Sequence, residues 1–138
     1  MEERIIFSGE PEKWFYDHYD YLFALAENNK FDEVPSHIKV YFVMRVMFDE
    51  IMNGGFGQFS SNSSRKLSKY LSDCVKSLNN KKLIKLVEQF CVVIGDSNNK
   101  LTHEDSLKLE KLSSDFYDIE DEYDLYDLLD NYYKNNNK

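Results

Sequence analysis

An apolar segment between Ile38 and Met52 constrains the fold of this chain more than any other feature. It follows Pro35, with Ser36 as the expected N-cap of a helix. Polar or charged residues interrupt it mainly at Lys39, Arg45, Asp49 and Glu50. A helix that is apolar on nearly all sides must be surrounded by other elements, because no side of it suits water. The segment therefore predicts a helix at the centre of a helical bundle.

The rest of the chain contains few residues that would punctuate short strands. It has only 2 prolines and 5 glycines, and alternation of β-branched residues is scarce. A loop is expected at 53–64, and a frayed tail at 134–138. The sequence predicts an all-α fold, a compact single-domain bundle of about six helices over residues 1–138. The other expected helices run from Pro11 to about Asn28, from about Arg65 to Leu78, between Asn80 and Gly95, from a capping box at Thr102 and Asp105 through Leu112, and from near Glu120 to Tyr133.

Composition and cysteine use indicate a globular protein of the cytoplasm. A chain of 138 residues that is 42% hydrophobic and 15% aromatic can fill a core without a metal ion or disulfides. Cys74 and Cys91 lie inside helical patterns, so we expect reduced thiols that act as small core side chains. No apolar run approaches the roughly 20 residues that span a bilayer. The N-terminus also lacks a basic region followed by a long apolar stretch, so neither secretion nor a membrane anchor is expected.

The negative charge is concentrated in one stretch of the chain. The formal net charge is -8, and the segment from Leu112 to Tyr133 has eight acidic residues and no Lys or Arg. The remaining residues are formally neutral, with 17 acidic and 17 basic side chains. Aromatic and leucine residues alternate with the acids, which indicates an ordered element rather than a disordered tail. Direct nucleic-acid binding is disfavoured, because such a surface repels phosphates.

No arrangement of residues points to catalysis or to a metal. His18, His37 and His103 are scattered over separate elements, without Cys or carboxylate partners at metal-ligand spacing. There is no nucleophile elbow and no strand that leads into a glycine-rich phosphate loop. The sequence predicts that the chain is not an enzyme and that it uses no cofactor and no metal ion.

The segment from Glu50 to Phe59, with Asn62 shortly after, resembles a family signature, E-x-x-N-G-G-F-x-Q-F-x-x-N. The signature is that of the bacterial DNA-mimic-protein-like family, whose members are small α-helical domains. Residues 112–119 and 128–132 resemble the family's closing pattern, so the resemblance covers about 35–133. It implies an acidic surface that imitates the phosphates of duplex DNA and occupies the DNA-binding surface of a basic protein.

We interpret the signature residues as structural rather than as a ligand-binding loop. Asn53 is expected to end the central helix, while Gly54 and Gly55 take backbone conformations closed to other residues. Phe56 and Phe59 are expected to fill the core. The remaining amides, Gln58 and Asn62, are expected to bond to the loop backbone, which would otherwise lack partners. Under this interpretation the motif identifies the fold and does not perform the function.

The candidate functional surface is therefore the acidic segment near the C-terminus. On one continuous helix from Glu120, four acids would lie opposite the apolar side chains, with Asp118 and Asp121 at the edge. Successive carboxylates would then be about 4.5–6 Å apart along the axis, which is of the same order as the ~3.4 Å of axis per phosphate of a DNA strand. The expected partner-binding residues are Asp118, Glu120, Asp121, Asp124, Asp127 and Asp130.

Such a row of carboxylates would suit several cationic partners. A DNA mimic that binds a transcriptional regulator or another DNA-binding protein is the first hypothesis. An immunity-type protein that neutralises a cognate toxin is the second, and an unrecognised enzyme is the third. An uncharacterised domain without mimicry is a further alternative. A homodimer is also possible from the sequence. Neither direct binding to nucleic acid nor binding to a membrane is expected.

Overall fold

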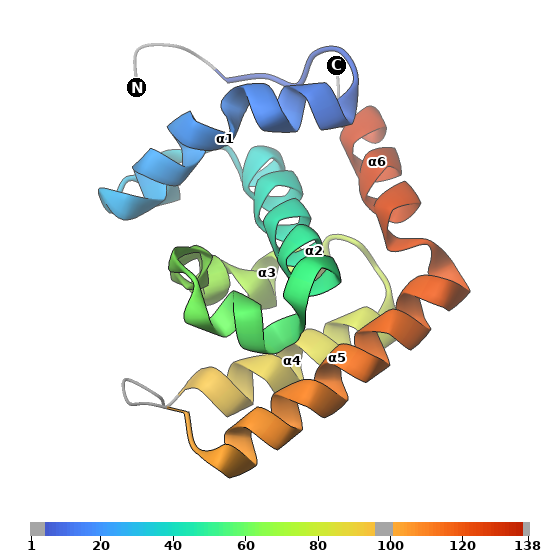
Figure 1. The fold of residues 1–138 in the computed structure, drawn as a ribbon. Coiled ribbons are helices and arrows are strands. Elements are labelled where there is room, and N and C mark those ends of the chain that lie inside the picture. The colour runs from blue at the N-terminus through green and yellow to red at the C-terminus, as the bar shows by residue number, and fades with distance from the viewer. Residues whose placement is uncertain (1–4, 96–100, 137–138) are drawn as a thin grey trace.

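The computed structural model describes residues 5–95 and 101–136, and within them it contains α- and 3-10 helices but no strand. This confirms the predicted all-α fold with six α-helices. In chain order (Figure 1) the elements are α1 (Pro11–Glu27), the 3-10 helix η1 (Phe31–Glu33), α2 (Ser36–Ser61), the 3-10 helix η2 (Ser63–Tyr70), α3 (Leu71–Lys76), α4 (Lys81–Gly95), α5 (His103–Tyr123) and α6 (Leu125–Asn135).

The central position of α2 is confirmed. Every residue from Val40 to Phe48 is buried, and α1, η2, α3, α5 and α6 all pack against this helix. Burial extends even to Arg45, whose side chain keeps 7% of its surface exposed. Only the end of the predicted apolar segment reaches solvent, since Met52 is 45% exposed. The helix begins one residue earlier than expected, with Pro35 at the N-cap and Ser36 as the first helical residue.

The loop expected at 53–64 is wrong for most of its length. The chain stays helical to Ser61 and is interrupted only at Gly55, which has φ 80° and ψ -179°. Asn53 therefore does not end the helix. The three-residue spacing of Phe56 and Phe59 turns both rings toward the core, so burial favours a second helical piece after the break.

Two hydrogen bonds from α5 hold the break in α2. The Ser113 hydroxyl accepts a bond of 2.8 Å from the Phe56 backbone N–H, and it donates to the Leu109 carbonyl. The Tyr117 hydroxyl donates to the Ile51 carbonyl at 2.8 Å. In an unbroken helix that carbonyl would accept from the N–H of residue 55. Side chains of α5 thus provide partners for backbone groups beside the break.

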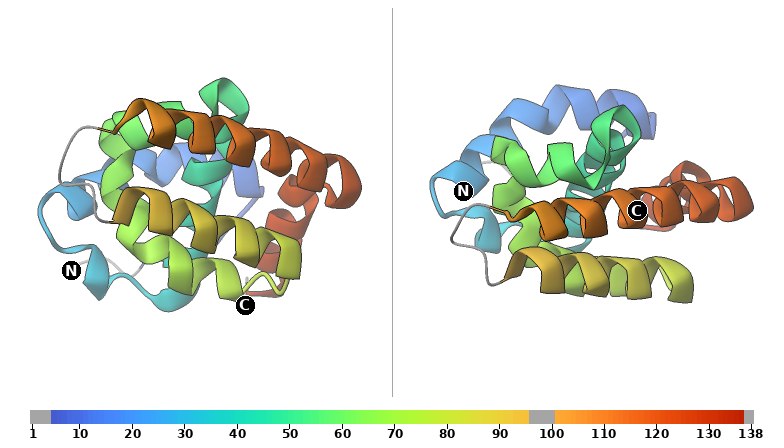
Figure 2. Two further views of the ribbon diagram at one scale, coloured as in Figure 1. Left: turned by 90° about the horizontal axis from the view of Figure 1, so that it is seen from below. Right: turned by 60° about the horizontal axis from the view of Figure 1, so that its bottom comes forward.

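The next part of the chain differs from the expected helix at 65–78. It forms η2 and then the short helix α3, while the helix expected between Asn80 and Gly95 is present as α4. The capping box at the start of α5 is confirmed, because the Asp105 backbone N–H donates to the Thr102 hydroxyl and the Thr102 N–H donates to the Asp105 carboxylate, both at 3.0 Å. Figure 2 shows α4 and α5 running side by side, as their packing contacts require.

The prediction of a last helix that begins near Glu120 is also wrong. α5 is continuous to Tyr123, and α6 turns away from its end (Figure 2) after the left-handed residue Asp124, which has φ 51°. α6 packs on the rest of the fold through three buried side chains, Leu125, Leu129 and Tyr133. It includes Lys134 and Asn135, so the predicted tail is helical at its start, and residues 137–138 lie outside the described residues.

Both cysteines are free thiols, as predicted, with Cys74 buried and Cys91 half-buried against the core. Among the described helices, none is long and apolar enough to cross a bilayer.

Candidate protein-binding surface

The junction between α5 and α6 is built by acidic side chains that bond to the backbone. Asp124 takes the left-handed conformation, which Asp tolerates better than most residues. Its carboxylate accepts from the Asp127 N–H at 3.2 Å and caps α6. The Glu120 carboxylate accepts from the Leu125 N–H at 2.7 Å. Both bonds satisfy backbone donors of the first turn of α6 that have no partner within that helix.

This junction brings four of the six predicted partner-binding acids together. We call Glu120, Asp121, Asp124 and Asp127 the acidic corner. Glu120 is half-buried and the other three are exposed. Burial raises the pKa of Glu120, and repulsion from Asp124, Asp121 and Asp127 raises it further. The two hydrogen bonds of the junction hold these side chains near one another, although Glu120 and Asp121 belong to α5 and Asp127 belongs to α6.

The other two predicted acids lie elsewhere. Asp118 lines a groove between α4 and α5 together with lysines that include Lys82 and Lys111. Asp130 is half-buried near Arg45, and its Oδ1 atom is buried without a hydrogen-bond partner among the described residues. The prediction of one continuous acidic helix face is therefore wrong, because α5 ends at Tyr123 and α6 points in a new direction.

The acidic corner carries charge that the described residues do not neutralise by ion pairs. Its neighbours on α5 are paired: Asp115 with Lys111 at 3.3 Å and Glu122 with Lys82 at 2.7 Å. Within residues 5–95 and 101–136, the four corner acids have no such partner within 4.0 Å. Because these carboxylates are not in ion pairs with described residues, a cationic partner can bind them without first breaking an ion pair within the described part of the chain.

The polar residues of the signature form a hydrogen-bonded group. Oε2 of Glu50 accepts from the Gln58 amide at 3.1 Å and from the Asn62 amide at 2.8 Å. The expectation that both amides bond to the loop backbone is wrong, because the helical backbone after Gly55 satisfies itself and leaves the side chains for each other. This group joins the end of α2 to the part before its break.

The Phe residues of the signature are buried, and one of its two adjacent glycines has the predicted backbone conformation. Phe56 and Phe59 are fully buried against Phe90, as predicted. Gly55 has the expected positive φ, whereas Gly54 does not. A side chain at Gly54 would instead collide with the Gln58 side chain.

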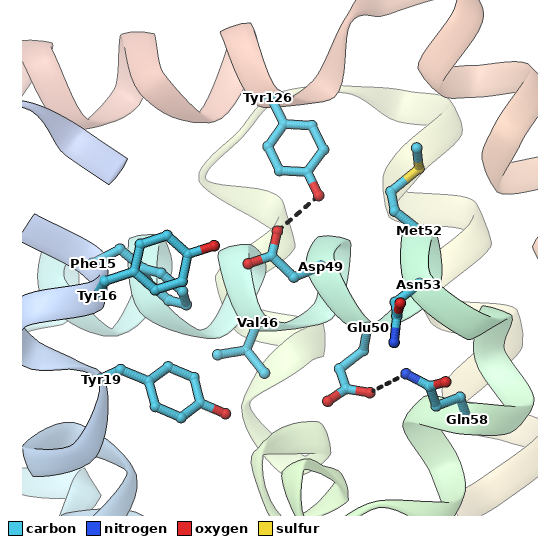
Figure 3. A pocket seen from close by; sticks show the side chains of 10 residues that line it. All are labelled: Phe15, Tyr16, Tyr19, Val46, Asp49, Glu50, Met52, Asn53, Gln58 and Tyr126. Atoms are coloured by element: carbon cyan, nitrogen blue, oxygen red, sulfur yellow. Dashed lines mark hydrogen bonds between the residues drawn. The ribbon is translucent and has the colours of Figure 1, made fainter. Parts of the chain in front are cut away.

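A cleft of about 480 Å³ opens beside the signature, between α1, α2 and α6 (Figure 3). Signature residues form one end of it, and aromatic side chains from α1 and α6 form its sides. Sequence reasoning missed this site because its residues come from three helices, although Tyr16 and Tyr19 share a face of α1 by their spacing. The lining residues are Phe15, Tyr16, Tyr19, Val46, Asp49, Glu50, Met52, Asn53, Gln58 and Tyr126.

The floor of the cleft is acidic. Asp49 accepts from the Tyr126 hydroxyl at 2.8 Å and pairs with the buried Arg45 at 3.2 Å. Burial, and then the Asp49 carboxylate, raise the pKa of Tyr126, so its hydroxyl remains a donor at neutral pH. Among the described residues, no three His, Cys, Asp or Glu side chains are grouped so that they could hold a metal ion.

The comparisons with known proteins identify a family. A family model described as DMP19-like protein matches residues 32–136. No curated protein matches the chain. No solved structure matches it. The family match spans the signature, the cleft floor and the acidic corner, and it covers most of the chain. The chain therefore belongs to the DMP19-like protein family.

Proposed function

We propose that the chain is an acidic protein-binding domain of the DNA-mimic type. Its acidic corner occupies the DNA-binding surface of a basic partner, such as a transcriptional regulator. The family match supports the general type. The single observation that carries the proposal is the gathering of four carboxylates at one corner, three of them exposed and none in an ion pair with a described residue.

The physical basis of the proposal is electrostatic complementarity. A DNA-binding surface presents Lys and Arg side chains that neutralise phosphates. Each exposed ion pair contributes only about 0–1 kcal/mol, so no single carboxylate is expected to decide binding. A group of them raises the association rate and selects partners with a matching positive surface. The proposal makes the chain a binding protein of the cytoplasm, without catalytic chemistry or a cofactor.

The triple substitution Asp121→Asn, Asp124→Asn and Asp127→Asn tests the proposal. Asn matches Asp in size, tolerates the left-handed conformation at 124 and can still cap α6. The matched control replaces three exposed acids elsewhere that also lack an ion pair with a described residue: Asp20→Asn, Glu88→Gln and Glu110→Gln. Both variants lose three charges, so a difference between them reports position rather than net charge.

The measurement has two stages. Proteins captured by the wild-type chain are identified by mass spectrometry, and binding of the purified partner is then measured over a range of salt concentrations. The corner variant should bind more weakly and with a flatter salt dependence than the control. Duplex DNA should displace the wild-type chain from the partner. Equal affinities for the two variants would refute the proposal, and loss of affinity without competition by DNA would favour an immunity-type protein.

A further inference from the structure

The cleft between α1, α2 and α6 has the chemistry of a site for a cationic side chain. Its ten lining residues include two carboxylates, Asp49 and Glu50, and no Lys, Arg or His. Four of the ten have aromatic rings, which attract cations through their faces. A concave space of about 480 Å³ is large enough for one long side chain to enter. The shape of the cleft, its carboxylates and its aromatic rings therefore all suit a cationic side chain.

One acceptor in the cleft is unused. Both amide bonds to Glu50 end on Oε2, so Oε1 has no hydrogen-bond partner among the described residues. Figure 3 shows this oxygen directed toward the hydroxyl of Tyr19 across the floor of the cleft. Burial, and then the charge of Glu50, raise the pKa of Tyr19. The Glu50 oxygen and the Tyr19 hydroxyl oxygen are thus two acceptors in the lining of one cleft.

The protein itself already holds a guanidinium group with residues of the same cleft. The Arg45 guanidinium lies 5.1 Å from the ring centre of Phe15, 5.9 Å from that of Tyr16 and 5.2 Å from that of Tyr126. It pairs with Asp49 and, at 3.7 Å, with Glu12. Arg45 is buried and is not among the residues that line the cleft. It shows that aromatic rings of this cleft accept the face of a guanidinium group. Because Arg45 already balances the charge of Asp49, Glu50 is the carboxylate of the cleft left for a second cation.

We propose that the cleft receives an arginine side chain of the protein partner. The guanidinium stacks against Tyr16 and Tyr19 and donates hydrogen bonds to Oε1 of Glu50 and to the Tyr19 hydroxyl oxygen. Arginine suits the site better than lysine, because its planar fork can stack on a ring and donate two bonds at once. Lysine offers only a compact, strongly hydrated charge.

This inference rests on the proposed function and adds a contact to it. Tyr126 lines the cleft from α6, and its chain neighbours Asp124 and Asp127 belong to the acidic corner. The cleft therefore reaches the first turn of α6, the same turn that carries Asp124 and Asp127 of the acidic corner. A basic segment bound at the corner could place one arginine in the cleft, where the contact is less screened by water than at the exposed corner.

A synthetic peptide of five Arg-Ser repeats and its Lys-Ser counterpart are the probes. Affinities are measured by titration calorimetry for the wild-type chain, for Glu50→Gln and for the control Glu88→Gln, which removes an exposed carboxylate from α4. Gln at 50 keeps an oxygen acceptor for Gln58 and Asn62, so the group at the break is retained. Tyr16→Ala, at a residue that is 59% exposed, is a second variant, and its thermal melt is recorded to show that the fold is retained.

We expect the arginine peptide to bind the wild-type chain more tightly than the lysine peptide. Glu50→Gln should weaken its binding roughly tenfold, the effect of losing one charge-assisted hydrogen bond. Tyr16→Ala should also weaken it, and Glu88→Gln should change it by less than about twofold. The ring proton signals of Tyr16 and Tyr19 should shift on titration.

Three results would overturn the inference. They are equal affinities for the two peptides, equal effects of Glu50→Gln and Glu88→Gln, and binding of free spermidine that is as tight and as sensitive to Glu50→Gln as that of the arginine peptide. The last result would make the cleft a small-cation site. The two proposals fail separately. If the triple corner variant loses the partner while Glu50→Gln and Tyr16→Ala keep it, the corner proposal stands and the arginine site falls. If the triple corner variant binds the partner as well as its control does, the corner proposal falls.

Discussion

The Tyr126 hydroxyl on α6 donates a 2.8 Å hydrogen bond to the Asp49 carboxylate on α2, 77 residues earlier in the chain. The same carboxylate pairs with Arg45, which also contacts the Tyr126 ring face at 5.2 Å from its centre. One tyrosine thus ties the acidic C-terminal helix to the buried centre of the molecule. The position of the acidic corner depends on this attachment, because α6 carries Asp127 and begins directly after Asp124.

Tyr126→Phe should reduce the free energy of unfolding by about 1.5 kcal/mol, the contribution of a hydrogen bond to a charged group. The ring packing is preserved in Phe, so only the hydroxyl is lost. Urea denaturation measures the change. Tyr16→Phe is the matched control, because the Tyr16 side chain is exposed to solvent. Equal stabilities of the two variants would contradict the importance of the Asp49 bond.

Gly55→Ala should destabilise the fold by about 1–3 kcal/mol. The backbone at Gly55 has φ 80° and ψ -179°, a conformation that is nearly restricted to glycine, and a Cβ would also lie 2.9 Å from Ser113 Oγ. Gly57→Ala is the control, since a Cβ at that position would meet no atom of the described residues within 4 Å. It should be neutral or stabilising by up to about 1 kcal/mol in a helix. Thermal melts that rank the two variants in the opposite order would show that the break in α2 is not required.

Glu50→Ala should destabilise the chain by about 1 kcal/mol, because the Gln58 and Asn62 amides lose their shared acceptor. Glu50→Gln should cost less, since an oxygen acceptor remains. Chemical denaturation of both variants separates loss of the acceptor from loss of the charge. If Glu50→Ala and Glu50→Gln were equally stable, the hydrogen-bonded group would not hold the two parts of α2 together.

Asp130→Asn should make stability less dependent on pH. Burial raises the pKa of Asp130 above its ordinary value of 3.8, although Arg45 and Lys134 act in the opposite direction. A raised folded-state pKa means that the folded chain binds this proton more tightly than the unfolded chain does. Its contribution to stability is therefore fully present below pH 3.8 and is lost as the pH rises through the raised pKa.

The Asn variant lacks this titration, so its stability relative to wild type should increase as the pH rises through that interval. Melting temperatures from acidic to neutral pH measure the difference. Asp127→Asn removes an exposed carboxylate from the same helix and controls for the loss of one charge. If the stability of the wild-type chain rose with pH relative to that of Asp130→Asn, the prediction would be wrong.

Much of the fold could be predicted from local patterns. The continuous apolar run identified α2 as the central helix, Pro11 marked the start of α1, and Thr102 with Asp105 marked the start of α5. These signals are local, because they depend on residues within one or two turns of each other. The segment 53–64 was predicted as a loop and not as a helix broken at Gly55, since glycines and serines in sequence are typical of a loop as well as of a bent helix.

The candidate sites depended more on distant contacts. The excess of acids near the C-terminus is visible in the sequence, but its division between α5 and α6 is not. The helical periodicity of the sequence continues through Asp124, and only the left-handed backbone of that residue redirects the chain. The cleft could not be predicted, because Tyr16, Asp49 and Tyr126 lie on three helices and their proximity follows from packing.

The sequence by itself determined the helical class, the buried centre and the sign and location of the excess charge. Each follows from residue type and spacing along the chain. Tertiary structure alone decided which acids gather at the corner, which of them lies near Arg45, and which aromatic rings enclose the cleft. The physical reason is that helix directions are set by the burial of Leu125, Leu129 and Tyr133 against distant parts of the chain, and no local pattern encodes that packing.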